Sequence, residues 1–232
     1  MTFPIIELME TSDGSHTLYR PDLNETYHSQ HGALQESRYV FIERGLKPTM
    51  QRGLPGIRLM EVGLGTGLNM LLTALEVARV PNLFIDAISL EPFPIGSVLA
   101  KQLNYPAWLP QHANAGFLLE AIHRSPWEEE TSLARGFSLR KIQKALEDFQ
   151  PEELVIDLIY FDAFAPQKQA EVWTAANLKK CADLLAPGGM LITYCAQGQF
   201  KRELKAMGLK VEALPGPPGK RSITRAVKPL TV

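Results

Sequence analysis

A glycine-rich turn between an apolar strand and an apolar helix constrains this chain more than any other feature of its sequence. The turn lies in residues 59–71, LMEVGLGTGLNML, with glycine at positions 63, 65 and 67. Because glycine has no Cβ, a backbone with this spacing can turn sharply and approach a ligand closely. The segment therefore predicts a strand, a turn and a helix, with a binding site beside the turn.

The remainder of the chain alternates between strand and helix patterns. Strands are expected at 57–63, 83–91, 137–143, 154–161, 190–195, 209–214 and 222–227. Helices are expected near 66–80, 95–103, 170–185 and 200–208, with 104–136 mostly helical and a turn at 186–189. The run LVIDLIYF at 154–161 is apolar almost throughout, as in parallel strands covered on both faces. This order predicts an α/β fold with a doubly wound, mostly parallel, Rossmann-like sheet, which binds ligands at the carboxyl ends of its strands.

An extension precedes this alternation. Two short strand-like runs flank the sequence SDGS at 12–15, which is a hairpin signal, and residues 32–46 carry apolar side chains at helical spacing. We therefore expect an N-terminal hairpin and helix extension at 1–50 and the main domain at 51–232.

The composition argues against a membrane protein and a metal protein. No stretch approaches the roughly 18 apolar residues of a membrane helix, and the N-terminus lacks the pattern of a secretory signal, so a cytoplasmic location is expected. The two cysteines, Cys181 and Cys195, have no CxxC spacing, and His28 and His31 have no second ligand pair nearby. Buried free thiols and no metal are therefore expected.

Acidic residues beside the glycine turn indicate which cofactor it serves. A dinucleotide fingerprint GxGxxG would need glycine at 68, where this chain has Leu68, and Glu61 lies inside the preceding strand. A dinucleotide presents an anionic pyrophosphate, whereas S-adenosylmethionine carries an ammonium and a sulfonium that favour carboxylates. Glu91, in LEPFP, ends the next strand and can accept hydrogen bonds from both ribose hydroxyls. The pattern favours S-adenosylmethionine over NAD.

Asp162 is the candidate catalytic residue. It follows the apolar strand 154–161 at its carboxyl end and should face the cleft. There it can position an amine or alcohol nucleophile and take up its proton. The alternative is a structural role, because aspartate commonly caps loops and helices.

Six segments resemble, in the same order, one known family: YHSQHGALQESRYVFIERGL, EVGLGTGLNML, LEPFP, IYFDAFAPQKQAEVWT, LLAPGGMLITYCAQGQFKREL and GPPGKRSITRA. They resemble the methyltransferase domain of MnmC-type tRNA (5-methylaminomethyl-2-thiouridine)-forming enzymes, from about Tyr27 to Ala226. The resemblance implies methyl transfer from S-adenosylmethionine to the aminomethyl group of the modified wobble uridine. Some family members carry a fused flavin-dependent oxidoreductase domain; this chain is similar to the stand-alone form, with which a separate flavin-dependent enzyme would cooperate.

The resemblance also assigns roles to residues. It implies that Glu61, Gly63, Gly65, Gly67 and Asn69 line the methionine end of the cofactor, that Glu91 holds the ribose and that Asp162 faces the amine. For Asn69 the alternative is a polar side chain that merely decorates the first helical turn. Where the family usually has an Asp that contacts adenine, this chain has Ala145, so backbone groups or Glu147 would have to substitute.

The positive charge is concentrated at the C-terminal end. Residues 199–232 contain eight Lys and Arg and only two Glu, so this segment has a net charge of +6, whereas the whole chain has a net charge of −1. Lys220 and Arg221, on a Pro/Gly loop, are predicted to contact RNA, and the anticodon stem-loop is the expected partner. Two alternatives stay open: an N-methyltransferase of a small-molecule or protein amine, and a non-catalytic RNA-binding protein on the same fold.

Overall fold

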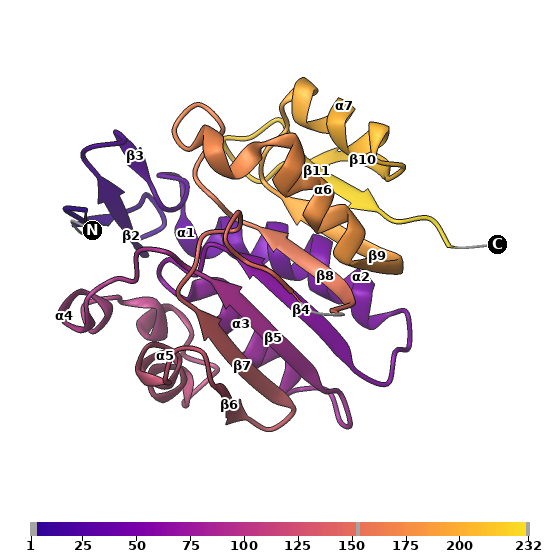
Figure 1. The fold of residues 1–232 in the computed structure, drawn as a ribbon. Helices are drawn as coiled ribbons and strands as arrows, with labels where there is room; N and C mark the ends of the chain where they lie inside the picture. The colour runs from indigo at the N-terminus through magenta and orange to yellow at the C-terminus, as the bar shows by residue number, and fades with distance from the viewer. Residues whose placement is uncertain (1–3, 152–153, 231–232) are drawn as a thin grey trace.

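The computed structural model describes residues 4–151 and 154–230 (Figure 1). The outer ends of the two expected units, 1–3 and 231–232, lie outside these residues. The main feature is an eight-stranded sheet with the order β10-β11-β9-β8-β4-β5-β7-β6. Its strands are β4 (Ile57–Val62), β5 (Ile85–Leu90), β6 (Glu130–Ala134), β7 (Phe137–Ile142), β8 (Ile156–Phe161), β9 (Leu185–Thr193), β10 (Lys210–Pro215) and β11 (Ser222–Val227).

The five central strands, β9, β8, β4, β5 and β7, are parallel, whereas β6, β10 and β11 pair antiparallel at the two edges. From β4 the chain proceeds to β5 and β7 on one side, then crosses to β8 and β9 on the other. The order reverses between β4 and β8, and open α/β sheets bind ligands outside the carboxyl ends of their strands at such a reversal. The predicted doubly wound, mostly parallel sheet is confirmed.

Helices cover both faces of the sheet (Figure 1). One face is covered by α3 (Leu68–Val77), α5 (Ala115–Arg124) and the helical run near the N-terminus. The other is covered by α6 (Ala175–Leu184) and α7 (Gly198–Ala206). Alternate residues of the central strands serve the two cores: Leu59 packs in the first, and Met60 in the second. This explains why the strands have no polar face.

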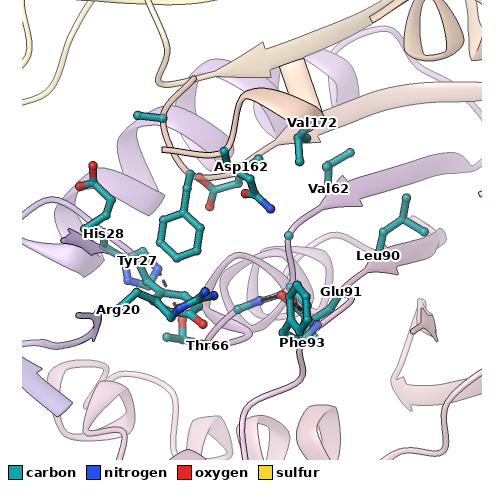
Figure 2. Close-up of a pocket in the computed structure, with 18 of the residues that line it drawn as sticks. Arg20, Tyr27, His28, Val62, Thr66, Leu90, Glu91, Phe93, Asp162 and Val172 are labelled. Carbon is teal, nitrogen blue, oxygen red and sulfur yellow. Dashed lines mark hydrogen bonds between the residues drawn. The ribbon is translucent and has the colours of Figure 1, made fainter. Parts of the chain in front are cut away.

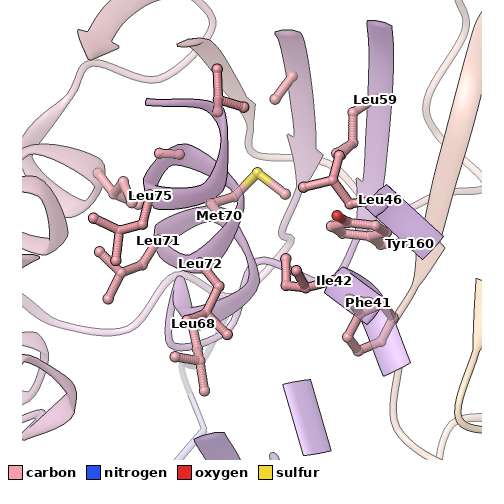
Figure 3. Packing of buried hydrophobic residues seen from close by; sticks show 14 of the residues in the cluster. Phe41, Ile42, Leu46, Leu59, Leu68, Met70, Leu71, Leu72, Leu75 and Tyr160 are labelled. Carbon is pink, nitrogen blue, oxygen red and sulfur yellow. The ribbon is translucent and has the colours of Figure 1, made fainter. Parts of the chain in front are cut away.

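The N-terminal segment forms a small antiparallel sheet followed by a helical run. Its strands are β1 (Glu7–Glu10), β2 (His16–Arg20) and β3 (Glu25–Thr26); its helices are α1 (Ala33–Ser37), η1 (Arg38–Leu46), which is π-helical, and α2 (Lys47–Met50). The predicted hairpin and helix are both present. Phe41, Ile42 and Leu46 pack against α3 and Tyr160 of β8 (Figure 3). The helical run therefore belongs to the core of the main sheet.

The structure differs from the sequence-based expectation in three segments. The helix expected at 95–103 is limited to α4 (Ser97–Ala100), and the segment 104–136, expected to be mostly helical, ends in strand β6. β6 forms a hairpin with β7, whose turn includes Gly136 at φ 75°. The turn expected at 186–189 is instead part of β9, which pairs irregularly with β8 there. The first two errors involve short or edge elements, where few apolar residues mark the period. The third lies in the long inner strand β9, where the sequence APGG resembles a turn.

Among the helices that the structure describes, none combines the length and the apolar composition that a bilayer crossing requires. Within residues 4–151 and 154–230, His, Cys, Asp and Glu side chains do not form a group of three or more that could hold a metal ion. Cys181 and Cys195 are buried free thiols, as expected.

Candidate active site

A cavity of about 730 Å³ lies at the carboxyl ends of the central strands (Figure 2). Its floor, as we use the term, consists of the loops that follow β4 (63–66), β5 (91–93) and β8 (162–165). Its roof consists of lining residues between positions 20 and 36, together with Lys220 from the loop before β11. The loop after β7, residues 143–148, closes one side. The cavity thus lies where the order of the strands reverses.

The glycine turn forms the centre of the floor. A Cβ on Gly63, at φ 95°, would lie 2.6 Å from the carbonyl oxygen of Asp162, and one on Gly65, at φ 50°, would lie 2.9 Å from the ring of Tyr27. These two positions therefore require glycine, and both line the cavity. Gly67, at the N-terminus of α3, is not among the lining residues; it packs toward Ile122 and His123.

Glu91 lies in the floor and holds two of its loops together. Its two carboxylate oxygens accept hydrogen bonds from the backbone N–H of Gly65 and of Phe93, each at 2.9 Å. Burial raises the pKa of Glu91, while the two backbone bonds and Arg20 act in the opposite direction. Each oxygen accepts one of these bonds and retains a further lone pair, so the carboxylate can still accept bonds from a ligand.

Asn69 links two acidic side chains. Its Nδ2 donates to Glu61 Oε1 at 3.1 Å and to Asp162 Oδ2 at 2.8 Å. Its buried Oδ1 has no hydrogen-bond partner among the residues that the structure describes, and Asn69 lines the cavity. A buried, unpaired acceptor is costly. The arrangement therefore suits a ligand with a hydrogen-bond donor, such as an ammonium group.

Glu61 lies behind Asn69. It is completely buried, is not among the lining residues, and accepts hydrogen bonds from Asn69 and from Ser89 Oγ. Burial raises the pKa of Glu61 well above its usual value, and the nearby Asp162 adds to the effect. The structure thus places Glu61 where it orients Asn69 and does not itself face the cavity.

Asp162 lies in the floor, immediately after β8, and lines the cavity. Burial raises its pKa to about 7, with the hydrogen bond from Asn69 lowering it, Glu36 raising it and Lys220 lowering it. The following loop is held in place from two sides: Tyr194 Oη donates to Ala163 O at 2.8 Å, and Trp173 Nε1 donates to Phe164 O at 2.7 Å. A carboxyl group that titrates near neutrality at a fixed position can accept a proton from a bound nucleophile.

The roof contains residues that sequence reasoning did not select. Tyr27 meets the ring of Phe164 edge-on, with the centroids 4.9 Å apart, and the Arg20 guanidinium lies 5.8 Å from the centre of the Phe164 ring. Arg20 is also bound by both carboxylate oxygens of Asp22, at 2.8 and 2.7 Å. Tyr27 and His28 lie in the first segment of the family resemblance, which was the available signal for them.

The two residues predicted to bind RNA occupy different environments. Lys220 lines the cavity, forms an ion pair with Glu36, and places its Nζ 3.8 Å from the centre of the Tyr194 ring. Arg221 is exposed to solvent. Ala145 and Glu147, in the loop after β7, both line the cavity, so the position at which the resemblance led us to expect an adenine contact lies at the cavity.

These groups together fit S-adenosylmethionine. The floor supplies a glycine cradle and the carboxylate of Glu91 for hydroxyl groups, and Asn69, in the first turn of α3, supplies a free acceptor for an ammonium. The cavity volume lies in the range of small-molecule cofactor sites. The carboxyl group of Asp162 lines the same cavity as this cradle.

Comparisons with known proteins agree with this geometry. Residues 117–229 match the model of a family of S-adenosyl-L-methionine-dependent methyltransferases. The chain is 31% identical, over 90% of its length, to the tRNA 5-methylaminomethyl-2-thiouridine biosynthesis bifunctional protein MnmC of Paracidovorax citrulli, of which it covers 34%. It is 32% identical over 83% of its length to the protein of the same name from Pseudomonas fluorescens, of which it covers 30%. The chain thus spans about a third of these relatives.

A solved structure extends the similarity to the fold. The crystal structure of MNMC2 from Aquifex aeolicus matches with a TM-score of 0.78 and 27% sequence identity, covering 99% of this chain and 73% of that one.

Proposed function

Because the chain is an S-adenosyl-L-methionine-dependent methyltransferase of the MnmC type, we propose that it methylates the aminomethyl nitrogen of 5-aminomethyl-(2-thio)uridine at the tRNA wobble position. The observation that carries the proposal is Asp162, a carboxyl group with a pKa of about 7 that lines the cavity and is fixed by Asn69. Relatives whose names specify this modification support the substrate.

The floor binds and orients the methyl donor. Gly63 and Gly65 allow close approach of the backbone, Asn69 Oδ1 accepts from the ammonium of the methionine portion, and Glu91 accepts from the ribose. When bound, S-adenosylmethionine supplies a methyl group on a positively charged sulfur, which becomes a neutral thioether as the N–C bond forms. Glu61 contributes by holding Asn69 in the orientation that leaves Oδ1 free.

Asp162 controls the nucleophile. An alkylamine is largely protonated at neutral pH and has no free electron pair, so it must lose one proton before it can attack. The Asp162 carboxylate holds the ammonium in place and accepts that proton, which a pKa of about 7 permits near neutral pH. Holding nucleophile and methyl group in line supplies much of the remaining acceleration, because correct orientation alone can be worth about 7–11 kcal/mol.

RNA recognition is part of the same proposal. Arg221 is exposed on the loop that also carries Lys220 at the cavity, so it can contact a phosphate while the wobble base enters. The partner is the anticodon stem-loop, and the protein acts in the cytoplasm, where that RNA is available. A separate or fused flavin-dependent enzyme generates the primary amine that this site methylates.

The decisive experiment uses tRNA isolated from cells that lack this protein. Incubation with the wild-type protein and S-adenosylmethionine, followed by nucleoside mass analysis, should convert the aminomethyl nucleoside to its monomethyl form. Matched tRNA without the aminomethyl group should remain unchanged. Transfer to free amines or to protein, with none to tRNA, would support the alternative N-methyltransferase; absence of cofactor binding in calorimetry would support the non-catalytic one.

A further inference from the structure

Lys220 was predicted to contact RNA, but its ammonium lies inside the catalytic cavity. It is 27% exposed and forms an ion pair with Glu36, whose side chain is only 8% exposed. Its Nζ also lies over the ring of Tyr194, and Tyr194 donates its hydroxyl hydrogen to the carbonyl of the residue after Asp162. The ammonium therefore has specific partners within the protein, from the roof and from the end of β9.

We propose that Lys220 is a positioning residue. Through its ion pair with Glu36 it determines the net charge of the cavity wall that the amine nucleophile contacts beside Asp162. The inference rests on the proposed function, because it concerns the amine that this function assigns. It gives Lys220 a role in catalysis that is separate from RNA contact by its neighbour Arg221.

Several ionisable groups surround this pair. Those that line the same cavity as Lys220, Glu36 and Asp162 are Arg20, Glu25, Tyr27, His28, His31, Glu91, Lys144, Glu147, Asp148, Glu171 and Tyr194, and Glu61 lies behind Asn69. Burial, with the nearby Lys220 acting in the same direction, lowers the pKa of His28 to about 4, so it is neutral at physiological pH. Burial likewise raises the pKa of Glu61 and of Tyr194 and favours their neutral forms. Glu36 and Lys220 line the same cavity as Asp162 and act on its pKa in opposite directions, Glu36 raising it and Lys220 lowering it.

The opposite charges of Lys220 and Glu36 explain how the ion pair can affect the nucleophile. Glu36 alone would add a second negative charge near Asp162 and would stabilise the amine as an ammonium, which cannot attack. Lys220 compensates that charge, so a substrate ammonium meets one effective carboxylate, that of Asp162. The ammonium then gives one proton to Asp162, and the nitrogen keeps the electron pair that forms the new N–C bond.

Charge-changing variants provide the test. Lys220→Met removes the positive charge, Glu36→Gln removes the negative charge, and the double variant restores a neutral wall of similar volume. The acidic limb of the pH profile of single-turnover methyl transfer should move to higher pH in K220M and to lower pH in E36Q. In the double variant it should return to the wild-type position. A shift of about one pH unit corresponds to a tenfold change in rate on that limb.

Two further measurements separate a charge effect from a structural or RNA-binding role of Lys220. Arg221→Met removes the neighbouring exposed cation and should leave the limb in place, as should Lys220→Arg, which keeps the charge. Isotope-labelled aspartate NMR on the free protein should show the pKa of Asp162 raised in K220M and lowered in E36Q, whatever the substrate is. This titration needs no methyl transfer.

The outcomes are distinct. A structural role of Lys220 would shift the acidic limb in the same direction in K220M and E36Q, or would lower the rate equally at every pH. An RNA-binding role would shift the limb equally in R221M and K220M. Any of these results would overturn the inference. If the wild-type protein transfers no methyl group to aminomethyl tRNA at any pH, the proposed function fails. In that case, a pKa of Asp162 that rises in K220M and falls in E36Q would still support the proposed effect of the ion pair. The same pKa of Asp162 in both variants and in the wild type would overturn it.

Discussion

The floor and the roof of the cavity are built in different ways. In the floor, Glu91 and Asp162 each follow directly on a parallel strand, and the glycine turn follows a third, so the sheet itself brings them together. In the roof, Glu36 and Lys220 are separated by 184 positions in the chain and meet only because segments near both ends of the chain fold over the same edge. The floor is thus specified by local sequence, and the roof by long-range packing.

This difference has a functional consequence. In the proposed function, the floor binds the methyl donor through the glycine turn and hydrogen-bond acceptors. This task is the same whichever nucleophile accepts the methyl group. In that function the nucleophile lies beside Asp162, in the cavity that the roof residues line from the other side. We therefore expect substitutions in the floor to affect cofactor binding, and substitutions in the roof to affect the choice and protonation of the nucleophile.

Asp162 belongs to the floor, but its proposed partner is the nucleophile and not the cofactor, and its replacement should have the largest effect. Asp162→Asn keeps the shape but cannot accept the proton of the amine, so single-turnover methyl transfer should fall by about 10³-fold. Affinity for S-adenosylhomocysteine, measured by calorimetry, should stay within a few-fold of wild type. Near-normal turnover in this variant would remove Asp162 from the catalytic role.

Glu91 tests the floor alone. Glu91→Gln weakens the two backbone hydrogen bonds and the contact with the ribose, so cofactor affinity should fall about 10- to 100-fold, the range expected for charged hydrogen bonds. The matched control is Glu25→Gln, a carboxylate of the roof that also lines the cavity. Equal losses in both variants would contradict the division of labour between floor and roof.

Glu61 tests whether an acidic residue behind the floor binds the cofactor or supports Asn69. Burial raises the pKa of Glu61 in the folded protein above its value of about 4.5 in the unfolded chain. The neutral side chain therefore contributes to the free energy of unfolding below pH 4.5, and this contribution declines as the pH rises toward the pKa of the folded protein. Glu61→Gln, which stays neutral, should therefore gain in Tm relative to wild type by a few degrees between pH 4.5 and pH 8. Thermal melts across this range provide the measurement.

The same variant separates the two roles. If Glu61 acts only through Asn69, cofactor affinity in E61Q should change by a few-fold at most. A collapse of affinity in a variant that melts normally would show that Glu61 contacts the cofactor directly.

Arg221 should show the smallest effect. Arg221→Met removes one expected phosphate contact, so tRNA affinity should fall by a few-fold, and the slope of log K against log salt should decrease in magnitude by about one. Lys101→Met, which removes an exposed cation from the segment after α4, is the control and should leave the slope unchanged. Identical slopes for wild type and R221M would exclude a phosphate contact at this residue.

The accuracy of the predicted elements depends on how long an apolar pattern each element carries. The central strands and α3 were predicted from long apolar periods, and the structure confirms them. The hairpin strand β6 was missed, because a short strand at the edge of a sheet, half exposed, carries few apolar residues. The place of Gly67 and of Glu61 outside the cavity lining could not be foreseen either, because a motif does not show which of its residues face the ligand.

The sequence by itself determined the parallel sheet, the glycine turn and the positions of Glu91 and Asp162, because a side chain that follows an apolar parallel strand has only one edge of the sheet at which to lie. Only the tertiary structure decided that Asn69 bridges two acidic groups and that Lys220 turns inward to Glu36. These contacts depend on the burial and direction of side chains brought together from distant parts of the chain. No local pattern encodes them.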